Sequence, residues 1–402
     1  MKQKTAAMCS TFSGSAQRNN LRVLKALRSS EGVSRADLPR RTGLSAGTIT
    51  AVTSDLIARG LVVEKKAEAV GRGRPRVYLE LNAEGGTVVG ARLSEKRELQ
   101  ISFVDLAGRE RVSTSAALPR PTSLRNFAEL IAVQLEQVIA AHMGSAPDIR
   151  HVSLSLPALV DSHRGDVHFM TTFDSGPVPF SSIISRRISL PVTVENDSVC
   201  QIRAEHWFGR AQEFDDFTLI NVGYAVTSAR YAGGLLRTGA GGFTPELGHV
   251  KTTYGADARV CFCGSHGCAT AYSSTVGLVL SPDEWGPGDQ PILETVDQRF
   301  EALLGAAAAG DQRAAQMMRE AGDHLGRLAA NHVNASDPGT ILILVPDDRY
   351  LKLSQEAFQS SLSANTLPAL LARTKIEFAV RTPDWHWKGI AALALEDAYS
   401  AP

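Results

Sequence analysis

The sequence predicts an α/β body that is preceded by a winged helix-turn-helix domain. The first observation is a division of charge: residues 1–82 hold 15 of the 42 basic and 6 of the 42 acidic residues, which leaves 27 basic and 36 acidic residues in the remainder. The second is a change of pattern near residue 87, after which strand-like runs alternate with longer helical periodicities, as in α/β domains. We therefore expect one domain over residues 1–82 and another over residues 83–402.

Composition excludes several classes of protein. The sequence has no run of about 18 apolar residues, so no transmembrane helix and no membrane partner are expected. The first twenty residues lack the apolar core of a secretory signal. Five cysteines in 402 residues are too few for a disulfide scaffold, which favours a cytoplasmic protein.

Two short helices are expected at the start of the basic segment. Apolar residues recur at helical spacing in the first helix: Leu21, Val23, Leu24 and Leu27. Basic residues are expected on its outer side: Arg22, Lys25 and Arg28. Ser34 is the predicted N-cap of the second helix, which buries Leu38, is bent or shortened by Pro39 and ends at Gly43.

A third helix is expected between Ser45, its predicted N-cap, and Gly60. One side carries an apolar stripe: Ile49, Val52, Leu56 and Ile57. The other side is small and polar: Gly47, Thr48, Thr50, Ala51 and Ser54. Two helices joined by a four-residue turn are typical of a helix-turn-helix, in which small residues let the second helix enter the major groove. The predicted DNA contacts on this helix are Ser45, Thr48, Thr50 and Ala51.

A β-wing is expected to follow. Two strand-like runs, 61–66 and 77–82, flank the sequence Gly-Arg-Gly-Arg-Pro-Arg at 71–76. Arg72, Arg74 and Arg76 at its tip suit DNA phosphates or a narrow minor groove. The alternatives are a basic unstructured arm and a small helical bundle with a basic loop.

The body is expected to contain mixed sheets with interleaved helices. Strand-like runs occupy 87–93, 98–106, 151–160, 191–196, 217–226, 228–236 and 340–346. Helical patterns occupy 123–142, 198–209 and 311–336. No repeat of 20–50 residues is visible in the sequence.

Three closely spaced cysteines predict a metal site. Cys261, Cys263 and Cys268 lie in a glycine-containing loop, and two histidines compete for a fourth position, His249 upstream and His266 within the loop. Three thiolates and one imidazole form a closed tetrahedral set, which is typical of structural rather than catalytic zinc, one ion per chain. The alternative is a coincidental group of free cysteines.

Several segments of the body form a distinctive combination. They are NVGYAVTSARYAGGLLRTGAGGFTPELGH at 221–249, CFCGSHGC at 261–268, LSLPALVD at 154–161, PVTVENDSVC at 191–200, and the C-terminal LGRLAANHVNASDPGTILI and GIAALAL. Together they resemble the repressor/open-reading-frame/sugar-kinase (ROK) family. The resemblance implies a two-lobed actin-like, ribonuclease-H-like fold. A winged helix before that fold is the arrangement of the family's repressor branch, and homodimers or homotetramers are its implied assemblies.

The resemblance also implies site residues. Asn196, Asp197, Glu246 and His249 match the residues that hold sugar hydroxyls in the family's kinases, where the aspartate is the general base. His249 rather than His266 is the implied fourth metal ligand, and Cys9 and Cys200 are bystanders. A further glutamate of the family, two residues after the last cysteine, is replaced here by Thr270.

Kinase activity is not expected, and no residue is predicted to be catalytic. Phosphoryl transfer needs glycine-rich backbone around the nucleotide phosphates. The family's first phosphate loop corresponds to Arg92-Leu93-Ser94-Glu95, which has no glycine. The second corresponds to residues 223–229 and keeps only its first glycine, and the glycines on the adenosine side are replaced by Val345-Pro346-Asp347-Asp348.

These features together predict a DNA-binding transcriptional regulator. We expect a repressor of sugar-metabolism genes whose affinity for a double-stranded operator is controlled by a sugar or sugar phosphate. One alternative is a regulator with a vestigial sugar pocket that responds to a protein partner. Another is an active sugar kinase with an attached DNA-binding domain.

Overall fold

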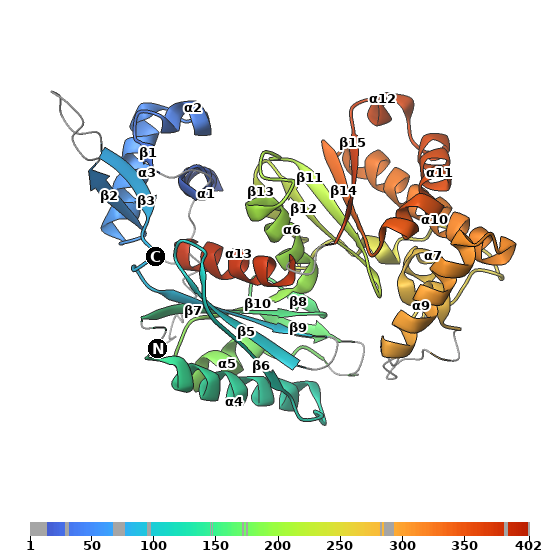
Figure 1. Cartoon of the computed structure of the whole chain (residues 1–402), viewed down its shortest axis with the longest axis horizontal. Coiled ribbons are helices and arrows are strands. Elements are labelled where there is room, and N and C mark those ends of the chain that lie inside the picture. The colour runs from blue at the N-terminus through green and yellow to red at the C-terminus, as the bar shows by residue number, and fades with distance from the viewer. Residues whose placement is uncertain are drawn as a thin grey trace, which may run out of the picture.

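The computed structural model describes residues 14–28, 32–66, 77–94, 98–144, 146, 148–170, 173, 176–281, 284, 293–381 and 385–400. The predicted wing tip with Arg72, Arg74 and Arg76 lies outside these residues, as does Cys9. The described chain forms a small N-terminal unit and two larger α/β lobes (Figure 1). Among the described residues, every helix is too short or too polar to cross a membrane.

The N-terminal unit is the winged helix-turn-helix that the sequence predicts. Its helices are α1 (Gly14–Arg28), α2 (Leu38–Thr42) and α3 (Ala46–Ala58). Its strands are β1 (Val33–Ser34), β2 (Val62–Lys66) and β3 (Val77–Leu81), which form a sheet in the order β1-β3-β2. β2 and β3 pair antiparallel from Val62–Leu81 to Lys66–Val77 and form the base of the wing.

The start of α2 differs from the sequence prediction. Ser34 lies in β1 opposite Tyr78 of β3, and its Oγ donates to Asp37 Oδ2 over 2.6 Å. Asp37 takes the N-cap position, so Pro39 lies in the first turn of α2, where a missing N–H costs no hydrogen bond. Gly43 ends the helix with φ of +69°, a conformation that favours glycine.

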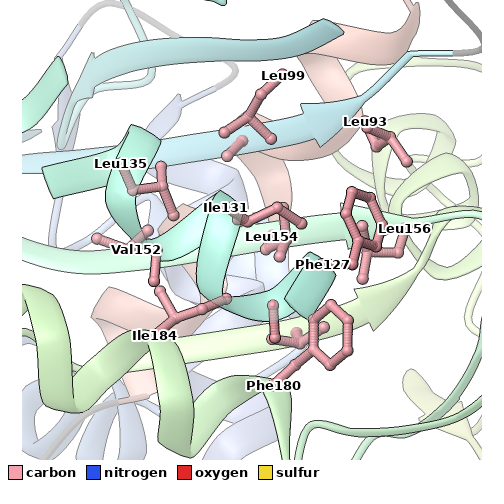
Figure 2. Packing of buried hydrophobic residues seen from close by; sticks show 14 of the residues in the cluster. Leu93, Leu99, Phe127, Ile131, Leu135, Val152, Leu154, Leu156, Phe180 and Ile184 are labelled. Atoms are coloured by element: carbon pink, nitrogen blue, oxygen red, sulfur yellow. The ribbon is translucent and has the colours of Figure 1, made fainter. Parts of the chain in front are cut away.

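The first lobe contains a five-stranded sheet in the order β10-β7-β4-β5-β6. Its strands are β4 (Thr87–Leu93), β5 (Glu98–Asp105), β6 (Glu110–Ala117), β7 (Ile149–Leu156) and β10 (Val192–Asn196). Helices α4 (Leu124–His142) and α5 (Phe180–Ile188) cover one face, where leucine, isoleucine, valine and phenylalanine side chains form the core (Figure 2). A hairpin of β8 (Leu159–Asp161) and β9 (Asp166–Phe169) extends this lobe.

The second lobe contains a five-stranded sheet in the order β13-β12-β11-β14-β15. Its strands are β11 (Phe217–Val222), β12 (Val226–Ala232), β13 (Leu235–Arg237), β14 (Thr340–Val345) and β15 (Lys375–Val380). Its helices are α7 (Thr270–Ser273), α8 (Thr275–Val279), α9 (Leu293–Ala308), α10 (Gln312–Ser336), α11 (Asp348–Asn365) and α12 (Pro368–Leu371), with a 3-10 turn η1 (Leu247–His249). The expected strands 217–226 and 228–236 are wrong in their limits. A turn at 223–225 and another at Gly233-Gly234, where both glycines have positive φ, divide this stretch into β11, β12 and β13.

Two helices join the lobes. α6 (Asp197–Phe208) leads from β10 of the first lobe to β11 of the second, and α13 (Trp385–Ser400) returns from β15 to pack on α6, β4 and β7. Glycines allow this close packing: a Cβ at Gly90 would lie 1.9 Å from Ile390, and one at Gly389 would lie 2.6 Å from the Cys200 carbonyl oxygen. The core of the N-terminal unit continues into α13 through Leu395 and Tyr399.

Candidate functional site

The predicted DNA-contacting side of α3 is exposed. Ser45 caps the helix and accepts a hydrogen bond from the Thr48 N–H over 3.2 Å, as predicted for an N-cap. Thr50 and Ala51 are exposed, and Thr48 is half-buried. The opposite side is buried in the core of the N-terminal unit: Ile49, Val52, Thr53 and Leu56, with Ile57 half-buried beside them. Four small side chains are therefore available on the surface of the second helix of a helix-turn-helix.

Four potential metal ligands meet beside η1. One ligand atom from each of His249, Cys261, Cys263 and Cys268 lies within 4.8 Å of the others, so the cluster could hold a metal ion. Cys263 Sγ lies 3.8 Å from Cys268 Sγ, and Cys261 Sγ lies 3.7 Å from His249 Nδ1. A tetrahedral zinc ion separates two sulfur ligands by about 3.8 Å and a sulfur and a nitrogen by about 3.6 Å, given bonds of about 2.3 and 2.0–2.1 Å. These two distances match those between ligand atoms in a tetrahedral site.

Backbone hydrogen bonds and a lysine support this cluster. The Cys261 N–H donates to the Ser265 carbonyl over 2.7 Å, which closes the loop between the cysteines. Lys251 Nζ lies 2.9 Å from Cys268 Sγ and also bonds to Ser265. Burial raises the pKa of Cys261 and lowers that of His249. Lys251 was not among the residues predicted from the sequence, because its contact with Cys268 depends on how the chain folds between residues 251 and 268.

His266 and Cys200, which also carry nitrogen and sulfur atoms that can bind a metal, lie outside this cluster. His266 forms a bridge with Val260 in the loop, and among the described residues the cluster of potential ligands does not include it. Cys200 is buried in α6, where burial raises the pKa of its thiol to about 12. The structure thus groups His249, and not His266, with the three cysteines.

The residues expected to bind a sugar come from both lobes. Asn196 and Asp197 lie where β10 ends and α6 begins, Glu246 directly precedes η1, and His249 is the last residue of η1. Although the Glu246 side chain is exposed, the protein around its carboxyl and the negative charge of Asp197 raise its pKa to about 6. The two carboxyls therefore lie close enough to sense each other's charge.

Much of the Asn196 side chain is used within the fold. Its Oδ1 accepts the Ser198 N–H over 2.7 Å and caps α6, and its Nδ2 donates to the Ala158 carbonyl over 2.6 Å. Thr270 is fully buried, and its Oγ1 accepts a hydrogen bond from the Val226 N–H over 3.3 Å. Asn196 and Thr270 are thus buried, whereas Asp197 is half-buried and Glu246 is exposed.

Two groups of polar side chains connect loops of the second lobe to α9. The Tyr224 hydroxyl bonds both carboxylate oxygens of Asp297 on α9, over 2.8 and 3.0 Å. Asp347 caps α11 and pairs with Arg349, which also binds Glu301 through two hydrogen bonds of 2.7 Å. These contacts tie the β11–β12 turn and the end of β14 to α9.

Known proteins are similar in sequence to this chain over most of its length. The chain is 26% identical to the DNA-binding transcriptional repressor Mlc of Escherichia coli (strain K12), over 86% of this chain and 85% of Mlc. It is 25% identical to the DNA-binding transcriptional dual regulator NagC of the same strain, over 96% of each chain. It is 24% identical to a xylose repressor of Caldicellulosiruptor bescii, over 96% of this chain and 97% of that protein.

Solved structures share the fold. A crystal structure of a ROK family transcriptional regulator, described as a homologue of the E. coli Mlc protein, superposes with a TM-score of 0.76 at 24% identity, over 96% of this chain and 97% of that one. A ROK family glucokinase from Streptomyces griseus superposes with a TM-score of 0.57 at 24% identity, over 77% of this chain and 99% of the kinase. The sequence profile described as "ROK family" matches residues 98–363, more than half of the chain. The protein therefore belongs to the ROK family.

Proposed function

We propose that this protein is a DNA-binding transcriptional regulator, and specifically a repressor of sugar-metabolism genes. The observation that carries the proposal is a winged helix-turn-helix joined to a ROK body in one chain, because the relatives NagC and the xylose repressor match 96% of this chain and so include both parts. Residues 1–82 form the DNA-binding domain, and residues 83–402 form the effector-binding and oligomerisation domain. Its place of action is the cytoplasm.

The DNA contacts are divided between α3 and the wing. Ser45, Thr48, Thr50 and Ala51 approach base edges and phosphates in the major groove, supported by their position on the helix surface opposite the core. Arg72, Arg74 and Arg76 provide phosphate or minor-groove contacts. A homodimer or homotetramer presents two such units to a near-palindromic operator.

The effector is a sugar or sugar phosphate bound by Asn196, Asp197, Glu246 and His249. Carboxyl groups from the two lobes lie within range of each other's charge, so a ligand that binds both would favour one lobe arrangement. The name of the xylose repressor points to xylose as the first sugar to test.

The four-residue cluster holds one structural zinc ion per chain. Three thiolates and one imidazole at tetrahedral spacing fill the coordination sphere, which leaves no open position for a reacting water. When bound, the ion would hold the loop of residues 261–268 against η1 and thereby position Glu246. No step of the function passes through the metal.

The protein is not a sugar kinase. Tyr224 follows the one glycine that the second loop keeps, and Asp347 lies among the residues that replace the glycines on the adenosine side; the Tyr224 hydroxyl binds Asp297, and Asp347 pairs with Arg349. Side chains at these positions would crowd a bound nucleotide. They would also keep its phosphates away from the backbone N–H groups that phosphoryl transfer requires.

The test begins with DNA. Duplex fragments selected from genomic DNA by the purified protein should share a near-palindromic site and should bind with salt-dependent affinity. Changing Arg72, Arg74 and Arg76 to alanine should reduce the slope of log affinity against log salt by about 0.9 for each phosphate that the variant no longer neutralises. An unchanged slope would remove the wing from the interface, and failure to select any site would contradict the proposed function.

A regulator with a vestigial sugar pocket is the second candidate. It is favoured by the internal hydrogen bonds of Asn196 and by the burial of Thr270 in place of a glutamate. Thermal unfolding with xylose, glucose, N-acetylglucosamine and their phosphates separates the two candidates, because a ligand of the folded state raises the melting temperature. A melting temperature that none of these compounds shifts would favour the vestigial pocket.

A further inference from the structure

Helix α1 of the N-terminal unit has an apolar side and a basic side, which contact different parts of the protein. Its apolar side, with Leu24 and Leu27, packs in the core that also contains Leu56 of α3. Its other side carries four basic residues, which we call the basic face of α1: Arg18, Arg22, Lys25 and Arg28. Sequence periodicity predicts three of these as outward-facing residues, and the structure shows that they face the rest of the protein.

Three residues of the basic face contact the second lobe. Arg22 forms an ion pair with Asp215, in the segment between α6 and β11. Lys25 Nζ donates to the Gln212 carbonyl over 3.5 Å in the same segment, and Arg18 donates to the Gly233 carbonyl over 3.3 Å in the β12–β13 turn. The contacts thus follow α1 over two turns of helix and reach two separate segments of the lobe.

Arg28 continues the basic face onto α6. Its guanidinium lies 3.4 Å from the ring centre of Phe208 and 5.6 Å from that of Trp207, which is the arrangement of a cation–π interaction. Burial lowers the pKa of Arg28 to about 10 and that of Lys25 to about 7. Both side chains are half-buried, so part of their surface is unavailable to a DNA backbone.

The end of α3 is attached to a different part of the molecule. Arg59, the C-cap of α3, donates to the carbonyl of Tyr399 on α13, and its own carbonyl accepts from Arg150 on β7 over 3.4 Å. Arg111 of β6 donates to the Ala83 carbonyl over 3.0 Å, just after the wing. The N-terminal unit is thus held by the second lobe along α1 and by the first lobe and α13 near α3 (Figure 1).

We propose that the basic face of α1 is an intramolecular docking surface through which the second lobe sets the orientation of α3. If the lobes move relative to each other, two attachments on different lobes must turn the N-terminal unit. An effector signal then reaches α3 within one chain, before any change in dimer geometry. This inference rests on the proposed function for its purpose, but the docking itself does not depend on DNA binding.

Charge reversal and charge exchange test the docking in the full-length protein. Arg22→Asp places two carboxylates together, and Arg22→Asp/Asp215→Arg restores an opposite pair with the net charge of the wild type. Arg187→Asp is the matched control, because Arg187 pairs with Glu136 inside the first lobe at similar exposure, 46% and 45% against 40% and 52% for Arg22 and Asp215.

Amide hydrogen exchange of residues 14–28 and 209–216 is the direct measurement. We expect exchange in both segments to be about threefold faster or more in Arg22→Asp, and to return to the wild-type rate in the exchanged pair. The control should leave both segments unchanged. Equal exchange in Arg22→Asp and the control would overturn the proposal.

A random-sequence duplex distinguishes docking from direct DNA contact. If Arg22 binds phosphate, affinity should fall in Arg22→Asp and stay low in the exchanged pair, whose residue 22 is still acidic. That result, without restored exchange rates, would overturn the proposal in favour of a DNA contact. If no variant and no wild-type protein binds duplex DNA, the proposed function fails, and the exchange rates still decide the docking.

Discussion

Replacing Cys263 by serine should release the metal with little other damage. Cys263 is exposed, whereas Cys261 and Cys268 are buried, so the substitution removes a ligand without emptying a packed site. A metal that is 1,000-fold above its dissociation constant stabilises the folded state by about 4 kcal/mol. For a lobe of roughly 180 residues, each kcal/mol corresponds to about 2–4 °C. The unfolding transition of the second lobe should therefore fall by about 8–16 °C.

The assay combines metal content with calorimetry. Elemental analysis should find about one zinc ion per wild-type chain and well below one in Cys263→Ser, and added chelator should lower the wild-type transition towards that of the variant. Cys200→Ser is the control, because Cys200 lies in α6 outside the cluster. It should keep its zinc. Stoichiometric zinc in a Cys261→Ser/Cys263→Ser double variant would refute the assignment of the ligands.

Three further outcomes are expected. Lys251→Met should lower zinc affinity about 10- to 100-fold in competition with a chelator, as loss of an outer-shell partner does, and equal affinity would deny a role to its contact with Cys268. Asp197→Asn should still bind the selected operator but need roughly 10- to 150-fold more sugar for the same response, and identical response curves would exclude this pocket as the sensor. Burial raises the pKa of Glu195 to about 7, so its contribution to stability is full below its ordinary pKa of 4.5 and is lost as the pH rises through 7. Glu195→Gln should therefore reduce the fall in the free energy of unfolding, measured with urea, between about pH 5 and 7. An unchanged dependence on pH would mean that other groups cause the fall.

Local patterns predicted the N-terminal unit and the metal cluster well. In α3 the cap, the apolar stripe and the terminal glycine all act within a few residues, and the structure confirms them. The three cysteines share one short loop, so their meeting follows from spacing. Ser34 was assigned wrongly because Ser-x-x-Asp can serve as a cap or as a strand end, and only the pairing with Tyr78 decides between them.

The sequence alone did not predict contacts between segments that lie far apart in the chain. Arg22 and Lys25 were expected to face outwards, because amphipathic periodicity separates apolar from charged sides and does not show that a segment far along the chain covers the charged side. The same reason hid the contact of Lys251 with Cys268. The strand limits near Gly223 failed differently, because an apolar run with one glycine does not show whether the chain turns there.

The attachment of the N-terminal unit bears on how a ligand signal could travel. α6 and α13 join the two lobes, and Arg203 of α6 pairs with Glu396 of α13 over 2.7 Å in the interior. The next turn of α13 carries Tyr399, whose carbonyl accepts a hydrogen bond from the C-cap of α3, and the end of α6 carries Phe208, which contacts α1. A rotation of one lobe against the other must displace this helix pair, and both helices touch the N-terminal unit. Because the connection is complete within one chain, the proposed signal would reach α3 without a second subunit, and the proposed role of a second subunit is to place another α3 on a two-part operator.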